Sequence, residues 1–382
     1  MGKVKLGDVG IIITGNTPKT SEELNYSSND ICFVKPSDIS NDGISYIRNS
    51  EFYISEFARE KARILPANSV LVSCIGIIGK VGINQKECAF NQQINAIIPN
   101  EEKCVTEYLA YAIYAKKMML QAIANAPVVP ILNKTQFSDI EIFLPSLSEQ
   151  REVVKKLNNI DSVIYKRKRQ LEKLDELIKA RFVELFGDPK ENPKGYCKKQ
   201  LKETCNVITG NTPSRAVSEY YGEHIEWIKT DNIVSGLINL TTATEYLSEK
   251  GLAVGRTVEK DSILMACIAG SISSIGRVCI TDRKVAFNQQ INAIVPNDYN
   301  TLFLYVMLQI SKEYLVEGIN MALKGILSKS KLEEKEFILP PMELQKQFAV
   351  FVEQTDKTKL LVQKSLDKLE LLKKALMQKY FE

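Results

Sequence analysis

One long segment occurs twice in this sequence, and the duplication constrains the fold more than any other feature. Residues 13–18 (ITGNTP) recur as residues 208–213, and residues 89–97 (AFNQQINAI) recur as residues 286–294. Both pairs keep their order at an offset of about 195 residues, so each copy fills about half of the chain. Such a chain is built from two copies of one structural unit.

The first part of each copy, residues 1–145 and 188–340, is typical of a mixed α/β domain. Short runs of β-branched residues alternate there with Gly, Asn and Pro, which predicts strands near residues 69–74 and 262–267. One amphipathic helix is expected within each of these parts, at residues 107–124 and 302–317.

The second part of each copy, residues 146–187 and 341–382, contains almost no Gly and is rich in Leu, Lys, Glu and Gln, which predicts a long helix. Ser146 and Glu149 are expected to form a capping box where the first helix begins. Its apolar residues recur at heptad-like steps of three and four, with Arg167 as the one interruption: Val153, Leu157, Ile160, Ile164, Leu171, Leu174, Ile178, Phe182 and Leu185.

The second helix has a similar apolar stripe, which Thr355 and Lys359 weaken in its middle: Phe348, Val352, Val362, Leu366, Leu369, Leu372 and Leu376. Two helices of about 35 residues, each spanning about 50 Å, should bury these stripes against each other. Because a globular domain separates them in the sequence, they can pair antiparallel. We therefore predict an α+β fold: two mixed α/β domains separated by an antiparallel pair of long helices, a coiled coil, with an internal pseudo-two-fold repeat.

The composition is that of an ordinary soluble globular protein, with 45% hydrophobic and 25% charged residues. A net charge of +4 would tolerate a polyanionic partner without demanding one. The eight cysteines form no C-x-x-C pair, which favours a reduced thiol set. Neither a signal peptide nor an apolar run of about 18 residues is present, so we expect a cytoplasmic protein with no membrane contact.

An enzymatic function lacks the residues that it would need. His224 is the only histidine, which excludes paired histidine chemistry, and we expect it at the surface or in a loop. Cys74 and Cys267 recur in register, but their apolar flanks favour buried packing over nucleophilic roles. Residues 76–81 resemble a phosphate-binding loop, yet Cys74 and Val81 stand where Gly and Ser or Thr are required.

Two related but non-identical domains on a stiff spacer suit a ligand that offers two sites at a fixed separation. Duplex DNA is such a ligand, since dimeric proteins read half-sites about 34–36 Å apart or at multiples of that distance. Here one chain carries both domains, and because they differ, the DNA site could be asymmetric.

Several strings resemble type I restriction-modification specificity subunits across essentially the whole chain. Residues 209–215 (TGNTPSR), 227–233 (WIKTDNI) and 288–294 (NQQINAI) are similar to a target recognition domain of that family. Residues 144–150 (LPSLSEQ) resemble the entry to its helical region, and residues 185–195 resemble the exit. The resemblance implies the following domains: target recognition domain 1 at 1–145, a central helical spacer at 146–187, target recognition domain 2 at 188–340 and a C-terminal helical spacer at 341–382.

The resemblance also implies a role in bacterial defence as a non-catalytic subunit that binds a bipartite site in double-stranded DNA. Two methyltransferase subunits would bind along the helices, and two restriction subunits would join in the full complex. The chain itself would hold no cofactor, because S-adenosylmethionine, ATP and Mg²⁺ would belong to those partners. The second helix begins with residues 342–345 (MELQ) instead of 147–150 (LSEQ), which leaves equal docking at the two helices open.

Candidate DNA contacts are turn residues with Lys, Arg, Asn, Gln, Ser or Thr side chains, because phosphates attract cations and base edges need donors and acceptors. Lys80 with Arg277 and Lys35 with Lys229 correspond between the copies, which suits backbone contacts. Lys19, Arg215 and the loops at 77–78 and 271–275 differ, which suits base recognition. The full predicted set is Thr14, Asn16, Thr17, Lys19, Lys35, Lys80, Asn91, Gln92, Thr209, Asn211, Thr212, Arg215, Lys229, Ser273, Arg277, Asn288 and Gln289.

Some alternatives stay open at this point. The identical Asn-Gln-Gln strings could hydrogen-bond within the domain or read adenine. The basic run at residues 166–169 could be a solvated helix face, a methyltransferase contact or a DNA contact. The whole chain could instead target a fused restriction-methylation enzyme, which neighbouring genes would reveal. A scaffold that binds only protein would show no salt-dependent DNA affinity.

Overall fold

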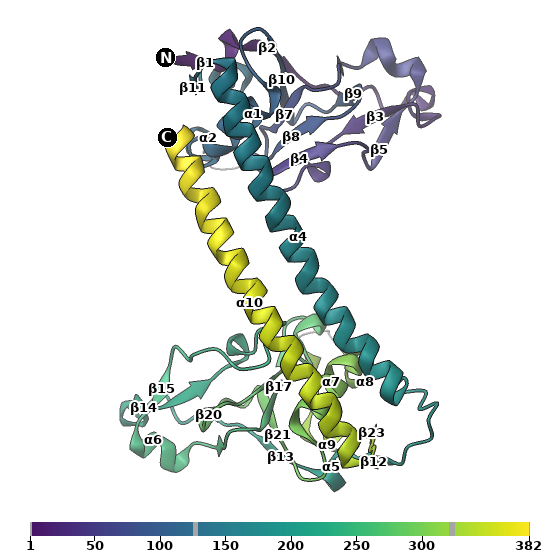
Figure 1. Ribbon diagram of the computed structural model, residues 1–382, viewed down its shortest axis with the longest axis vertical. Helices are drawn as coiled ribbons and strands as arrows, with labels where there is room; N and C mark the ends of the chain where they lie inside the picture. The colour runs from purple at the N-terminus through teal and green to yellow at the C-terminus, as the bar shows by residue number, and fades with distance from the viewer. Residues whose placement is uncertain (1, 125–128, 321–324, 382) are drawn as a thin grey trace. The chain divides into compact units, whose positions relative to one another are not determined.

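The computed structural model describes residues 2–124, 129–320 and 325–381, which divide into two compact units. Unit 1 runs to Lys168 and resumes at Lys364, and unit 2 is the intervening chain. The division therefore passes through both long helices, α4 (Leu147–Phe186) and α10 (Met342–Phe381). We call the α/β part of unit 1 that precedes α4 head 1, and the α/β part of unit 2 between α4 and α10 head 2 (Figure 1).

Head 1, drawn in purple to blue in Figure 1, contains two sheets and a two-stranded ribbon. The first sheet has the order β2 (Gly10–Thr14), β10 (Ile94–Pro99), β7 (Val70–Ser73), β8 (Val81–Asn84), β4 (Ile44–Ile47). The second has the order β5 (Phe52–Ile54), β3 (Ile31–Val34), β9 (Cys88–Phe90), β6 (Ile64–Leu65), and the ribbon pairs β1 (Gly2–Lys5) with β11 (Glu141–Leu144). Strands β3 and β9 are parallel, as are β4 and β8.

Head 2 repeats this arrangement. Its first sheet has the order β13 (Cys205–Thr209), β21 (Ile291–Pro296), β17 (Ile263–Ala266), β19 (Val278–Ile280). Its second has the order β15 (Tyr246–Leu247), β14 (Tyr221–Ile228), β20 (Val285–Phe287), β16 (Thr257–Val258), and its ribbons pair β12 (Lys198–Gln200) with β23 (Glu336–Ile338) and β18 (Ile268–Ala269) with β22 (Gly325–Ile326). The parallel pair of β3 and β9 recurs as β14 and β20, so the duplication predicted from the sequence is confirmed. The copies differ in detail: an isolated bridge between Asn239 and Ile280 stands in place of the β4–β8 pair, and one between Ile75 and Ile131 stands in place of the β18–β22 ribbon.

The first sheet is the middle layer of each head, which explains why its strands are apolar on both faces. In head 1, Val70 and Val72 of β7 pack in one core cluster with helix α1, whereas Leu71 packs in another with Phe90 of the second sheet. Head 2 shows the same division along β17, whose alternate residues enter two different clusters. Each head thus has a helix, a sheet and a second sheet stacked in that order.

The single helix expected in each head is instead broken in two. Head 1 has α1 (Thr106–Ala115) and α2 (Lys117–Ile123), and head 2 has α7 (Thr301–Ile310) and α8 (Lys312–Val316). The breaks fall at Lys116 and Ser311, whose φ is −85° with ψ near zero, outside the helical range. The turn lets the second short helix bury Leu120 in head 1 and Leu315 in head 2, a tertiary effect that periodicity does not report.

Gly79 explains part of the string that resembles a phosphate-binding loop. Its φ is +82°, and an added Cβ would lie 2.9 Å from Cγ of Lys117 in α2. Glycine is therefore required there by the backbone and by the close approach of α2. The remaining short helices of the heads are α3 (Lys134–Ser138), α5 (Leu201–Thr204), α6 (Glu249–Val254) and α9 (Lys329–Glu333), together with 3-10 turns that include Pro36–Asp38 and Thr230–Asn232.

The long helices follow the predicted stripes closely. At the start of α4 the Ser146 N–H donates to Glu149 Oε2 at 3.0 Å, so the predicted capping box is confirmed. Every residue of the α4 stripe is buried or half-buried. In α10 the prediction is wrong at Leu372, which is 47% exposed, while Lys373 faces Asp161 of α4 at 2.5 Å. Alternating steps of four and three lead from Val362 through Leu366 and Leu369 to position 373 and then to Leu376. Lys373 therefore continues the heptad, and the apolar Leu372 lies one position off it.

Within each unit the two helix segments run antiparallel. In unit 1, Lys168 pairs with Glu370 at 3.0 Å and Asp161 pairs with Lys373, so residue numbers fall along one helix as they rise along the other. In unit 2, Asp175 pairs with Lys359 at 2.6 Å. Among the described residues, no helix combines the length and the apolar character that crossing a membrane requires.

Candidate nucleic-acid interface

Three turns leave the first sheet of each head at the same edge. Because β10 pairs antiparallel with both β2 and β7, its first residues lie beside the last residues of those two strands. The turns at residues 15–18, 74–79 and 91–93 therefore gather at one edge of head 1. In head 2 the pairing of β21 with β13 and β17 brings the corresponding turns together.

Gly15 and Gly210 allow two of these turns to touch. The Gly15 N–H donates to Ile94 O at 3.0 Å, and the Gly210 N–H donates to Ile291 O at 3.0 Å. An added Cβ would overlap the carbonyl oxygen of Asn91 in head 1 and that of Asn288 in head 2. Only glycine permits this approach, which fixes the Gly-Asn-Thr-Pro turn against the Asn-Gln-Gln turn.

Side chains reinforce this contact in the same way in both heads. In head 1, the Thr14 hydroxyl donates to Asn95 Oδ1 at 2.6 Å and the Thr17 hydroxyl donates to Gln92 Oε1 at 2.5 Å. In head 2, Thr209 donates to Asn292 at 2.8 Å and Thr212 donates to Gln289. The structure therefore brings together the predicted Thr and Gln residues of the two turns, and both glutamines are exposed.

The first residue of each Asn-Gln-Gln string is buried, whereas the middle residue is exposed. Asn91 and Asn288 are each 6% exposed, and each donates to the second glutamine of its own string. This burial favours the interpretation that the asparagines hold the turn, and it leaves Gln92 and Gln289 as the residues of the string that face outward.

Asn16 and Asn211 connect the same edge to an exposed arginine that sequence reasoning missed. Asn16 Oδ1 accepts the Arg63 N–H at 2.8 Å, and Asn211 Oδ1 accepts the Arg256 N–H at 2.8 Å. The guanidinium of Arg63 donates to Thr14 O, and that of Arg256 donates to Thr209 O. A signal was present, because each arginine stands six residues before the recurring serine of its copy, Ser69 or Ser262.

The structure places Lys80 inside head 1, although the sequence predicts a contact with DNA. Lys80 is 8% exposed, and its ammonium donates to Pro36 O at 2.8 Å. The corresponding Arg277 is half-buried and donates to Thr230 O at 3.2 Å. Both cations thus tie the turn after the third strand of the sheet to a 3-10 turn, and we leave Lys80 out of the surface proposed below.

Among the other predicted cations, Lys35 and Lys229 directly follow β3 and β14 of the second sheet. Lys35 lies over the ring of Phe52, with Nζ 3.1 Å from the centroid, and its counterpart Lys229 bonds to Glu245. Lys19 is exposed on the turn that follows residues 15–18, and Ser273 is exposed with its hydroxyl 3.0 Å from that of Ser271. Arg215 also contacts Glu245, so the second sheet of head 2 collects two of the predicted residues.

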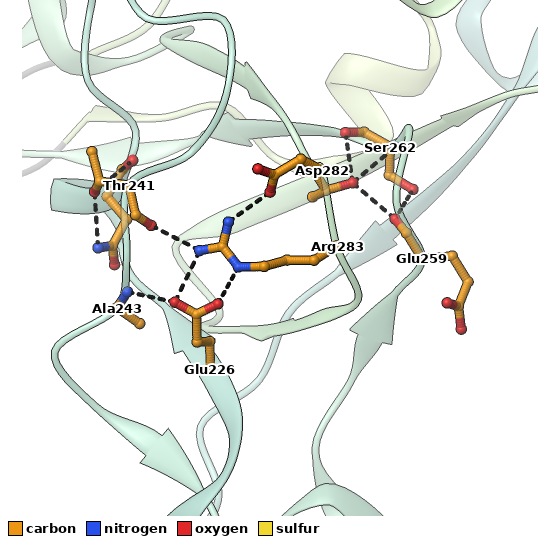
Figure 2. Close-up of polar contacts among 9 residues, drawn as sticks. Glu226, Thr241, Ala243, Glu259, Ser262, Asp282 and Arg283 are labelled. Atoms are coloured by element: carbon orange, nitrogen blue, oxygen red, sulfur yellow. Dashed lines mark hydrogen bonds and ion pairs between the residues drawn. The ribbon is translucent and has the colours of Figure 1, made fainter.

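A polar cluster braces the second sheet of head 2 (Figure 2). Arg283 forms a forked contact with Glu226, in which Nη2 donates to Oε1 at 2.9 Å, and it also donates to Asp282 at 2.6 Å. The Glu226 side chain is 12% exposed and accepts the Ala243 N–H at 2.8 Å. Hydrogen bonds from Arg283 lower the pKa of Glu226 below its ordinary value.

Removing the negative charge of Glu226 is expected to destabilise head 2 to an extent that depends on pH. Because the folded pKa of Glu226 is lowered, its contribution is present above the unfolded pKa of about 4.3 and is lost as the pH falls through the folded pKa. Glu226→Gln should therefore cost about 1–2 kcal/mol at neutral pH and less at about pH 3, measured by denaturant unfolding. Glu249→Gln, at a carboxylate whose side chain is 86% exposed, is the control. An equal loss at both pH values would contradict the prediction.

The residues weighed as catalytic do not form a reactive site. Burial raises the pKa of the Cys74 thiol to about 12, and it does the same for Cys267, so neither is a ready nucleophile. His224 is exposed on β14. In the described parts of the chain, no three His, Cys, Asp or Glu side chains are grouped so that they could hold a metal ion.

The chain is thus a duplicated protein with two α/β heads, which carry equivalent turns and are each joined to a pair of antiparallel helix segments. The chain belongs to the type I restriction-modification specificity family, since the model described as "Type I restriction modification DNA specificity domain" matches residues 1–175 and 193–371. The resemblance stated from the sequence and the predicted fold class are confirmed. Proteins of this kind are non-catalytic recognition components, and the chain is a specificity subunit of this type.

Individual relatives agree with this assignment. The type I restriction enzyme MjaIX specificity subunit of Methanocaldococcus jannaschii is 28% identical over 400 residues, covering 98% of this chain and 91% of that protein. The HindI specificity subunit of Haemophilus influenzae is 34% identical over 143 residues, covering 37% of this chain and 31% of that protein. The S subunit structure from M. genitalium has a TM-score of 0.62 at 15% identity, covering 100% of this chain and 96% of that one, which supports the fold.

Proposed function

We propose that this specificity subunit binds an asymmetric bipartite site in double-stranded DNA, with one half read by each head. The observation that carries the proposal is that the same polar edge occurs twice with partly different side chains. Corresponding residues suit contacts to phosphates, which are alike in both half-sites, and differing residues suit base recognition.

The proposed surface consists of the predicted residues that are exposed or half-buried, except Thr14 and Thr209, together with the two arginines found in the structure. In head 1 these are Asn16, Thr17, Lys19, Lys35, Arg63 and Gln92. In head 2 they are Asn211, Thr212, Arg215, Lys229, Arg256, Ser273, Arg277 and Gln289. Thr14, Thr209, Asn91 and Asn288 hold the turns that present them. The boundaries 1–145, 146–187, 188–340 and 341–382 remain our proposal for the domains.

We further propose that two methyltransferase subunits dock along α4 and α10 and that two restriction subunits join in the full complex. S-adenosylmethionine, ATP and Mg²⁺ are then bound by those partners, and the complex works in the cytoplasm. Lys168 and Arg169 of the basic run are paired with Glu370 and Glu172, which supports a structural role for part of that run. The buried start of α10 resembles that of α4, because Gln345 occupies the position of Gln150 and is equally buried.

The test uses the full chain purified with its methyltransferase partner. We expect binding to duplex DNA that weakens linearly in log affinity as log salt rises, and methylation mapping that returns two unlike half-sites at one spacing. The chain alone should neither methylate nor cleave DNA. Absence of salt-dependent DNA affinity would favour a scaffold that binds only protein. A neighbouring gene that encodes a fused restriction-methylation enzyme would favour the fused-enzyme alternative.

The recurring arginines should contribute affinity without specificity. Replacing Arg63 and Arg256 together by Ala should weaken binding to all sequences alike, because phosphates are the same in every sequence. Each phosphate contact removed should also lower the magnitude of the salt slope by about 0.9. Binding isotherms at several salt concentrations would measure the change. Lys329→Ala, at an exposed lysine of α9 that pairs with Glu333, is the control. A changed methylation motif with an unchanged salt slope would contradict this role.

A further inference from the structure

In head 2, the side chains of Arg215 and Lys229 both contact the carboxylate of Glu245, next to two aromatic rings. Arg215 Nη2 lies 2.5 Å from Glu245 Oε2, and Lys229 Nζ contacts the other oxygen of the same carboxylate. The Arg215 guanidinium carbon lies 4.3 Å from the centroid of the Tyr221 ring and 5.1 Å from that of Trp227. These contacts hold a flexible side chain in one place while 56% of it stays exposed.

The aromatic pair is itself fixed to the turn that carries Arg215. The Tyr221 hydroxyl donates to Pro213 O at 2.6 Å, and Trp227 Nε1 donates to Asn211 O at 3.2 Å. Trp227 is 3% exposed, so it is a rigid part of the second sheet. The Gly-Asn-Thr-Pro turn, the aromatic rings and Arg215 therefore form one connected structure at the proposed DNA edge.

Head 1 does not share this arrangement. Alignment of the two Gly-Asn-Thr-Pro turns places Thr20 opposite Arg215 and Phe33 opposite Trp227. Lys35, the counterpart of Lys229, lies over the Phe52 ring. The tyrosine is common to both heads, since the Tyr26 hydroxyl donates to Pro18 O at 2.7 Å. The pair of Arg215 and Glu245 thus belongs to head 2, whereas the tyrosine bonded to the turn occurs in both heads.

We infer that Arg215 reads a guanine in the half-site bound by head 2, with Glu245 as the positioning residue that orients its guanidinium. This inference rests on the proposed function. A guanidinium carries several N–H donors in one plane, so it can keep its bond to Glu245 and still donate to O6 and N7 of guanine. A phosphate in the same place would meet the Glu245 carboxylate, whose pKa Lys229 and Arg215 lower, so that it stays charged at neutral pH. The guanine edge carries no formal charge, and its acceptors O6 and N7 have only partial negative charge, so it meets a weaker repulsion than a phosphate would.

The experiment compares Arg215→Ala, Arg215→Lys and Glu245→Gln with the natural full chain, each bound to its methyltransferase partner. Affinity is measured for duplexes in which each guanine of both half-sites is replaced in turn, and methylation is mapped genome-wide. Arg215→Ala should lose discrimination at one guanine of one half-site by roughly 5- to 150-fold, the range for a bidentate base contact. Arg215→Lys should lose part of it, since an ammonium cannot form the planar fork.

Glu245→Gln should weaken discrimination at the same guanine by a smaller factor and leave the other half-site unchanged, which a merely structural role would not do. Lys284→Ala, at an exposed ion pair with Glu259, is the matched control and should change nothing. A uniform loss of affinity with an unchanged motif and a lower salt slope would make Arg215 a phosphate contact and overturn the inference. So would an unchanged motif and affinity. Absence of salt-dependent DNA binding by the natural chain would instead overturn the proposed function.

Discussion

Phe348→Ala is expected to lower the free energy of unfolding of unit 2 by about 3–5 kcal/mol, the usual cost of truncating a buried phenylalanine. Phe348 of α10 is fully buried. Its ring centroid lies 5.5 Å from that of Phe182 and 5.6 Å from that of Phe186, both in α4, and 6.4 Å from that of Phe303 in α7. The substitution leaves a cavity where both helices meet the head, and edge-to-face ring contacts are lost with it.

The consequence for function follows from the place of this cluster. It joins the end of α4, the start of α10 and the helix that covers the first sheet of head 2, so loosening it loosens the support of the proposed DNA edge. Denaturant unfolding followed by circular dichroism measures the stability. Val350→Ala, on the same helix at a side chain that is 53% exposed, is the matched control. Equal losses for the two variants would contradict the prediction.

Unit 1 builds the corresponding junction from residues at the same repeat positions. Tyr108 of α1 takes the place of Phe303, and Phe381 of α10 takes the place of Phe186. Their ring centroids are 5.1 Å apart, and Val153 at the position of Phe348 packs in the same cluster. Each junction thus combines the start of one long helix with the end of the other. The junction in unit 2 is richer in aromatic rings, so truncation there should have the larger effect.

Periodicity predicted the faces of the long helices but not their partners. Spacing identified Phe182 and Phe348 as buried, because a stripe at steps of three and four marks the apolar side of a helix. It could not reveal that Phe303 lies against both, since contacts between distant segments depend on how the head folds. The wrong assignment at Leu372 has a different origin: regular heptad steps lead from Leu369 to position 373, and the apolar residue next to that lysine was assigned to the stripe in its place.

The sequence predicted the turns that form the candidate site, but not which of their side chains are exposed. The recurring Gly-Asn-Thr-Pro and Asn-Gln-Gln strings located the edge, because glycine and amide residues mark close turns. Sequence alone treated Lys80 as a surface cation, although tertiary contacts bury it against Pro36 O. It also passed over Arg63 and Arg256, each of which directly precedes a short strand, β6 or β16. Side-chain burial depends on long-range packing that local patterns do not encode.

Gln150 is the second site where a large effect is expected, and it concerns how a head is fixed to its helix. Gln150 is fully buried at the start of α4. Its Oε1 accepts the Val105 N–H at 2.8 Å, and its Nε2 donates to Pro145 O at 2.8 Å and to Lys103 O at 3.0 Å. Gln345 makes two of the corresponding bonds in unit 2, where Oε1 accepts the Asn300 N–H at 2.9 Å and Nε2 donates to Pro340 O at 2.8 Å.

Gln150→Leu should therefore destabilise unit 1 by about 2–4 kcal/mol, because it leaves backbone groups that are shielded from water without partners, each at about 1–3 kcal/mol. Gln150→Glu should not restore stability, since a carboxylate accepts the Val105 N–H but cannot donate to the two carbonyl oxygens. The comparison is made by denaturant unfolding, with Gln354→Ala at an exposed position of α10 as the control. If Gln150→Leu unfolds no more easily than that control, the glutamine does not fix the head. If it unfolds more easily than the control, the Gln150 side chain contributes to holding the start of α1 against the start of α4.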